Sequence, residues 1–127
     1  MNSGVSKCLI ALGVFTLAGA CEAETTAFPQ PCLKLLKVVD QCSSDGIDLV
    51  RMKRLEGQVI QIESAREGIY QSFLRRLKDE GYSAFSDNCA GEDFKKAIRI
   101  PQTRVADAID QFGGNSAICR RAIDTLK

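Results

Sequence analysis

Hydrophobic positions repeat every three to four residues over most of the chain, which is the period of an amphipathic α-helix. Between residues 32 and 42 the buried-type side chains form one stripe, at Cys32, Leu35, Leu36, Val39 and Cys42. Pro31 suits the first position of this helix, because its missing N–H would be unpaired there. The turn-forming residues S-S-D-G at 43–46 predict that the helix stops near Cys42.

A second apolar stripe predicts one long helix over residues 47–80. Arg66 occupies a step at which the pattern would place an apolar side chain. Gly57 and Gly68 would allow a bend in this helix, and Gly81 is a natural C-terminal stop. The core positions that the stripe predicts are Met52, Leu55, Val59, Ile62, Ile69 and Phe73.

The remaining third of the chain predicts a loop at 82–91 and three short helices. The first spans 92–99 and ends because Pro101 breaks it, the second spans 102–112 and ends at G-G, and Asn115 or Ser116 caps the third. Their predicted inward side chains are Phe94, Ala97 and Ile98, then Val105, Ile109 and Phe112, then Ile118, Cys119, Ala122, Ile123 and Leu126. No segment shows the period of two that a strand requires. The predicted fold is therefore all-α, a small bundle of four to five helices with one long central helix.

The N-terminus has the pattern of an export signal. Lys7 precedes a 13-residue apolar segment at 8–20, which suits a signal peptide and is shorter than the ~18 residues that a membrane span needs. We expect a signal peptide over 1–23 that is cleaved after Ala20 or Ala23, a flexible linker over 24–30 and a disulfide-bonded helical domain over 31–127.

Four of the six cysteines follow Ala23, and in an oxidising compartment they can form two disulfides. Cys32 and Cys42 cannot bond each other, because ten helical residues separate them by about 15 Å and a disulfide needs Cα atoms within about 7 Å. An antiparallel second helix would carry Cys89 back toward Cys32. The preferred pairing is therefore Cys32–Cys89 with Cys42–Cys119, and the crossed pairing stays open.

Cys21 has three possible fates. The segment L-A-G-A-C at 17–21 resembles a bacterial lipobox, although the usual leucine stands one place too early, at Leu17. Cleavage after Ala23 would remove Cys21, acylation would make it a lipid anchor, and cleavage after Ala20 alone would leave an odd thiol. A membrane association is expected only if Cys21 is acylated.

Composition excludes several classes of function. The chain has no histidine, so no Ser-His-Asp or Cys-His arrangement and no imidazole base or ligand can exist. The cysteine spacings match no zinc signature, and the chain has no phosphate-binding glycine motif. A net charge of +1 offers little drive for nucleic-acid binding. We expect a protein that is not an enzyme, needs no cofactor or metal and binds no nucleic acid; the enzymatic alternative is catalysis by carboxylates alone.

The leading hypothesis is an exported protein that binds another protein, as an accessory protein, chaperone, immunity protein or inhibitor. The bacterial periplasm is favoured and an extracellular location is the alternative. The cysteine placement and the motif E-x-x-Y at 67–70 are similar to those of small disulfide-containing helical pilotins of bacterial secretion systems, and no family is assigned on them. Arg66 is a candidate partner contact, unless its side chain extends past the core edge to solvent or pairs with an acid such as Asp107 or Asp110.

The alternative hypothesis is a carrier of a small apolar ligand or lipid in a cavity between the helices. Its candidate lining residues are aromatic: Tyr70, Phe73, Tyr82, Phe85, Phe94 and Phe112. The sequence determines neither the partner nor the oligomeric state.

Overall fold

The structure is a computed structural model that describes residues 28–127, and these form five α-helices with no strand among them. The helices are α3 (Gln30–Met52), α4 (Glu56–Glu80), α5 (Tyr82–Ala90), α6 (Glu92–Gln111) and α7 (Ala117–Asp124). The prediction of an all-α bundle is confirmed. The signal peptide, its cleavage site and Cys21 lie outside the described residues.

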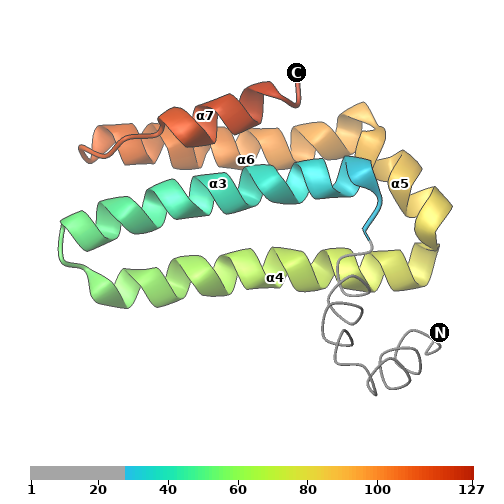
Figure 1. The fold of residues 1–127 in the computed structure, drawn as a ribbon, viewed down its shortest axis with the longest axis horizontal. Coiled ribbons are helices and arrows are strands. Elements are labelled where there is room, and N and C mark those ends of the chain that lie inside the picture. The colour runs from blue at the N-terminus through green and yellow to red at the C-terminus, as the bar shows by residue number, and fades with distance from the viewer. Residues whose placement is uncertain (1–27) are drawn as a thin grey trace, which may run out of the picture.

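Helix α3 is the centre of the bundle. Figure 1 shows α4 along one side of it, α6 and α7 along the other, and α5 across one end. Helix α3 packs along all four other described helices, whereas α4 packs along α3 and α5 and reaches α6 only through side chains such as Phe73. This arrangement explains why α4 buries only Val59 and Phe73 along its 25 residues. The residues that α3 buries are Cys32, Leu35, Leu36, Val38, Val39, Cys42, Asp45 and Gly46.

The predicted end of the first helix near Cys42 was wrong, because α3 continues through S-S-D-G to Met52. Two of these turn-forming residues make tertiary contacts that outweigh their low helix propensity. The buried carboxylate of Asp45 accepts a hydrogen bond from α7, and Gly46 is buried on α3 beside the side chain of Ile62 on α4. The predicted single helix over 47–80 was therefore also wrong. The chain turns at 53–55, where Arg54 has a φ of 60°.

Two predictions in the C-terminal half were wrong as well. Residues 82–90 form α5 instead of a loop, and α6 runs without a break past Pro101. A proline inside a helix costs about 3 kcal/mol. Burial of Ile98 and Gln102 on either side of the exposed proline offsets this cost, since both lie on the face that packs into the bundle. Gly81 ends α4 with a φ of 89°, as predicted.

An aromatic cluster fills the core where α4, α5 and α6 meet α3. Phe28, which the sequence places in the linker, is buried there, and its ring packs edge-on against Tyr70 at 5.5 Å. Phe73 contacts the rings of Phe85 and Phe94 at 5.6 and 5.4 Å. The folded domain thus includes residues that precede Pro31.

Two disulfides join α3 to the C-terminal half, and their pairing confirms the preferred one. Cys32 bonds Cys89 on α5 and Cys42 bonds Cys119 on α7, with Cα–Cα distances of 5.1 and 4.3 Å. Both cysteines of α3 belong to the predicted stripe, so the helix presents them on its packed face. Disulfides of this kind persist in oxidising compartments, which points to an exported protein.

Candidate functional site

Large apolar side chains are exposed at the end of the bundle where the α3–α4 and α6–α7 connections lie. Met52 is 60% exposed, Leu55 49%, Phe112 59% and Ile118 47%. Figure 1 shows the α3–α4 turn and the α6–α7 turn at this same end, opposite α5. We call the surface formed by these four residues, together with Leu49 and Val50, the apolar end.

The apolar end contains two adjoining hollows. One of about 240 Å³ is lined by Leu49, Val50, Leu55 and Phe112, and one of about 310 Å³ by Leu49, Met52 and Ile118 among others. Leu49 lines both hollows, so the surface is continuous across the two turns. Their volumes lie at or below the lower limit of small-molecule pockets, about 300 Å³. They suit single anchoring side chains of a protein partner better than a whole ligand.

A polar network fixes the α6–α7 turn that carries Phe112. The Ser116 hydroxyl donates to Asp110 Oδ1 at 2.7 Å, and Arg120 Nη2 donates to Asp110 Oδ2 at 2.7 Å and to Asp107 Oδ1 at 2.9 Å. The hydrogen bond from Ser116, followed by that from Arg120, lowers the pKa of Asp110 below its usual value. The turn is thus held by charge-assisted hydrogen bonds on one side of Phe112.

The start of α7 is held by α3. The Cys119 N–H, at the third position of α7, donates to Asp45 Oδ2 at 2.8 Å. Asp45 therefore performs from another helix the role of an N-cap side chain, which normally accepts the N–H of the second or third residue. The Cys42–Cys119 disulfide joins the same two helices, one turn of α3 before Asp45. These two links hold Ile118 in a defined place at the apolar end.

The second glycine of the G-G pair allows the two connections to approach closely. A Cβ on Gly114 would stand 2.8 Å from Ile109 Cγ2 and 3.1 Å from Leu49 Cδ1. The first distance is shorter than real Cβ contacts and the second is tighter than most of them, so any other residue here would require its neighbours to shift. The apolar end is consequently a preformed surface held by backbone packing, a disulfide and hydrogen bonds.

Positive charge flanks the apolar end on the α3–α4 connection. The segment R-M-K-R at 51–54 exposes Arg51, Lys53 and Arg54 around Met52, and none of the three forms an ion pair within residues 28–127. Asp48 and Glu56 are the exposed acids on either side of this segment. The three cations are available to a partner that carries negative charge.

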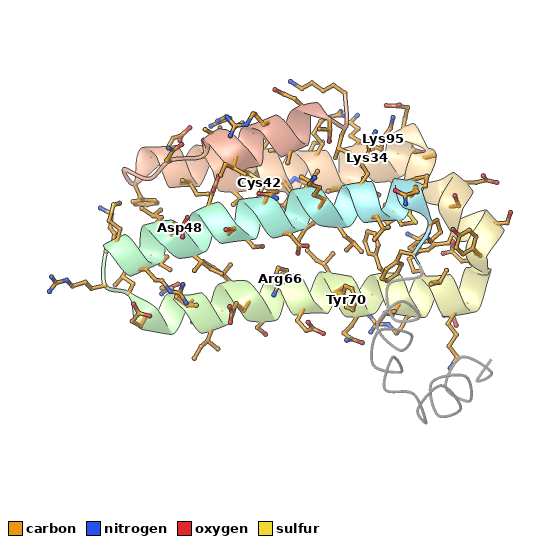
Figure 2. All side chains as sticks on the ribbon, in the orientation of Figure 1. Lys34, Cys42, Asp48, Arg66, Tyr70 and Lys95 are labelled. Carbon is orange, nitrogen blue, oxygen red and sulfur yellow. A yellow bond between two sulfur atoms is a disulfide. The ribbon has the colours of Figure 1, made fainter. Side chains whose placement is uncertain are left out.

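Arg66, the candidate partner contact, lies away from the apolar end, about midway along α4 (Figure 2). Its Nη1 donates to Asp40 Oδ1 of α3 at 3.2 Å, with the two side chains 42% and 56% exposed. The idea that Asp107 or Asp110 holds it was wrong, because both carboxylates bind Arg120. A partner contact at Arg66 stays a prediction.

The aromatic residues predicted to line a ligand cavity do not form one set. Tyr70, Phe73, Phe85 and Phe94 belong to the core cluster, where ring centroids lie 5.4 to 6.3 Å apart along the series of contacts. Tyr82 and Phe112 are exposed at opposite ends of the bundle, 60% and 59% respectively. Phe73, Phe85 and Phe94 contact one another, and Tyr70 joins them through Phe28. A carrier function stays a prediction.

Sequence reasoning placed the residues of the apolar end in the core. The stripes predicted Met52, Leu55, Phe112 and Ile118 to be buried, and all four are exposed. Ala97 and Val105, which lie earlier in α6, were also predicted to be buried and are exposed. A usable signal was present in the sequence. Met52, Leu55 and Phe112 stand next to charged or turn residues at helix ends, and Ile118 lies in the first turn of its helix, after G-G-N-S. At a helix end the apolar stripe has no further turn that would continue it.

No protein-family model, curated protein or solved structure matches the chain. Within residues 28–127, no three Cys, Asp or Glu side chains gather as metal ligands would. The helices of this part of the chain also lack the combination of length and hydropathy that a membrane span requires.

Proposed function

We propose that the protein acts by binding another protein through the apolar end, without catalysis. The observation that carries the proposal is the clustering of four large exposed apolar side chains, Met52, Leu55, Phe112 and Ile118, on a preformed surface. Single exposed apolar residues are normal on a protein surface. A contiguous group of them with a polar rim is typical of an interaction site.

The residue types also suit an interface. Aromatic residues and methionine are enriched in protein interfaces, and a few such anchors in well-packed hollows supply most of the binding free energy. Burying the exposed fractions of the four side chains would contribute about 3–6 kcal/mol at ~1.5–3 kcal/mol for each fully buried side chain. Association also costs rotational and translational freedom, so further contacts must come from the rim.

On the α3–α4 side, the rim favours a partner with negative charge. Arg51, Lys53 and Arg54 are exposed beside Met52 and Leu55, without ion pairs among the described residues. A segment whose apolar anchor fills the smaller hollow, with Asp or Glu beside it, would face these cations. A neutral or basic part of the partner suits the larger hollow, which Asp45 and Asp48 line. Electrostatic complementarity of this kind raises association rates and excludes positively charged competitors.

The rigidity of the apolar end supports the same role. The Cys42–Cys119 disulfide, the Asp45 cap and the Asp110–Arg120 network hold the α6–α7 turn and α7 against α3 before any partner arrives. A preformed surface loses little conformational entropy on binding. The disulfides agree with an exported protein, and the predicted signal peptide favours the bacterial periplasm, with an extracellular location as the alternative.

Site-specific photo-cross-linking in the exported protein tests the proposal. A photoreactive phenylalanine analogue is placed at Phe112 or Ile118, and at Tyr82 or Ile100 as controls. Tyr82 is 60% exposed at the opposite end of the bundle (Figure 1), and Ile100 is 40% exposed in the first half of α6, twelve residues before Phe112. We expect one identified protein to be cross-linked from 112 and 118 and not from 82 and 100. Equal cross-linking at all four sites, none at 112 and 118, or a cross-link to a second copy of the chain would contradict the proposal.

A further inference from the structure

The longest exposed stretch of the described residues is the connection from α3 to α4. All eight residues of 51–58 are exposed, whereas every other exposed run between residues 28 and 127 holds at most four. The stretch begins with R-M-K-R-L, and Arg54 at its turn has a φ of 60°. This left-handed conformation is unfavourable for residues with a Cβ. The connection therefore combines exposure, positive charge and a strained backbone.

Few interactions hold residues 51–58 in place. Within residues 28–127 their side chains form no hydrogen bond, ion pair or disulfide. The backbone bonds of the turn are local, such as the one from the Leu55 N–H to the Val50 carbonyl at 2.8 Å. Nothing lies within 4 Å of where a Cβ on Gly57 would stand, and the first buried residue of α4 is Val59. Local opening of this segment would expose little core surface, so it requires less free energy than opening a packed segment.

The other exposed cations stand in packed segments. Apart from Lys78, every exposed Lys or Arg outside 51–58 in the described part of the chain lies within two residues of a buried one. Opening the backbone around any of them would therefore pull a core residue into water. These cations are Lys34, Lys37, Arg75, Lys96, Arg104, Arg121 and Lys127.

Lys78 lies beside the α4–α5 corner, which Glu80 holds. The Glu80 carboxylate accepts hydrogen bonds from Arg76 Nε at 2.6 Å and from Asn88 Nδ2 at 2.7 Å. Asp79 also follows Lys78 directly. A negative charge next to the cleaved bond is unfavourable for a protease whose specificity pocket is itself acidic. The connection at 51–58 is thus the best substrate that this surface offers to a protease specific for basic residues.

We propose that the α3–α4 connection is a processing site, at which an endoprotease of trypsin-like specificity cuts the chain after Lys53 or Arg54. Exposed loop tips are the preferred sites of such nicking. Cleavage after Arg54 consumes one water: the bond between the Arg54 carbonyl carbon and the Leu55 nitrogen breaks, and a carboxylate and an ammonium group form at the new ends. Met52 and Leu55 lie on either side of the cut, so cleavage would divide one side of the apolar end.

The disulfides would keep the two pieces together. The cut separates α3 from the four helices that follow it. Both disulfides cross the cut, since Cys32 and Cys42 precede it and their partners Cys89 and Cys119 follow it. The expected product is a two-chain protein in which the bundle stays folded. Its formation is tested on the protein alone, so the outcome is independent of the proposed partner.

Timed digestion of the disulfide-bonded protein with dilute trypsin, followed by intact-mass analysis with and without reductant, tests the site. We expect a first product one water heavier than the chain, which reduction separates into a piece that ends at Lys53 or Arg54 and a piece that ends at Lys127. Before reduction, the nicked protein is expected to keep its helical circular dichroism. A first cut elsewhere in residues 28–127, no cut under native conditions, or loss of helical signal on nicking would overturn the proposal.

Two matched variants separate the connection from general accessibility. Lys53→Gln/Arg54→Gln removes the cations at the proposed bonds, and Arg75→Gln/Lys78→Gln removes two exposed cations of α4. The first nick is expected to form at least about tenfold more slowly in the connection variant and within about twofold of the unchanged rate in the control. Equal rates in the two variants would contradict the assignment.

The protein recovered from the cells that export it tests whether the site is used. Reduction of that material is expected to release the same two pieces, and the Lys53→Gln/Arg54→Gln variant expressed in the same cells is expected to stay as one chain. A parent protein that stays as one chain after reduction would refute processing.

Discussion

Replacing Asp45 with alanine tests how the apolar end is held in place. Asp45 is 5% exposed in the middle of α3, and its carboxylate accepts the Cys119 N–H of α7 at 2.8 Å. The substitution leaves this N–H, at the start of a helix, without its acceptor. It also removes a negative charge from the N-terminal end of the α7 dipole, where such a charge is stabilising.

The expected change in the free energy of unfolding follows from two opposing effects. A hydrogen bond to a charged group contributes about 1.5–3 kcal/mol, and alanine recovers at most about 0.7 kcal/mol of helix propensity. We expect Asp45→Ala to lower the free energy of unfolding by about 1–2.5 kcal/mol. For a domain of this size, that corresponds to a fall in Tm of about 5–15 °C. Asp45→Asn keeps a neutral acceptor and is expected to lose about 1 kcal/mol.

Asp48→Ala is the matched control, because Asp48 lies three residues farther along α3, is exposed, and forms no ion pair within residues 28–127. Both alanine variants gain the same helix propensity, so their difference isolates the hydrogen bond. Urea unfolding followed by circular dichroism, with both disulfides intact, provides the measurement. If Asp45→Ala is as stable as Asp48→Ala, Asp45 does not cap α7 and the account of the preformed end is wrong.

Three further predictions concern stability. Replacing Cys42 and Cys119 together with alanine should cost about 4 kcal/mol in urea unfolding, because the disulfide closes a loop with a sequence separation of 77; a loss below about 1 kcal/mol would contradict this. The folded state lowers the pKa of Asp110, so its contribution to stability is present at neutral pH and is lost as the pH falls below the usual value of 3.8. Asp110→Asn should therefore show a shallower loss of stability on acidification, and identical slopes would refute the argument. Arg66→Ala should change stability by less than about 1 kcal/mol, because its ion pair is exposed, and a larger loss in thermal unfolding would show a stronger role.

Most of the fold could be predicted from the helical periodicity and from the geometry of the cysteines. The stripe from Cys32 to Cys42 is buried as predicted, and the distance between these two cysteines along a helix was enough to exclude their bonding each other. The pairing also followed, because α4 does run back along α3 and returns Cys89 to Cys32. The core of a helical bundle depends on regular repeats, which a single sequence displays.

Helix ends were harder to predict, because tertiary contacts decided them. Asp45 and Gly46 have turn propensity, and their use as a cap for α7 and as a contact with α4 depends on residues more than fifteen positions away. Pro101 stays inside α6 for the same kind of reason, since its neighbours Ile98 and Gln102 are buried. Local propensity cannot anticipate such contacts.

The candidate site was missed because periodicity treats every apolar residue alike. Phe112 and Met52 continue the stripes of their helices, but no other described element covers the ends where those helices stop. Whether a stripe residue is buried there depends on how the ends of the helices align in space. That alignment is set by the disulfides and by the Asp45 contact, which the sequence does not show directly.

The affinity of the purified cross-linked partner for two matched variants shows whether the apolar end is the binding surface. Phe112→Ser and Tyr82→Ser each remove an aromatic ring that is about 60% exposed, at opposite ends of the bundle. Isothermal titration calorimetry is expected to show about tenfold weaker binding or worse for Phe112→Ser, and a change within about twofold for Tyr82→Ser. Equal affinities of the two variants would contradict the claim that the apolar end binds the partner.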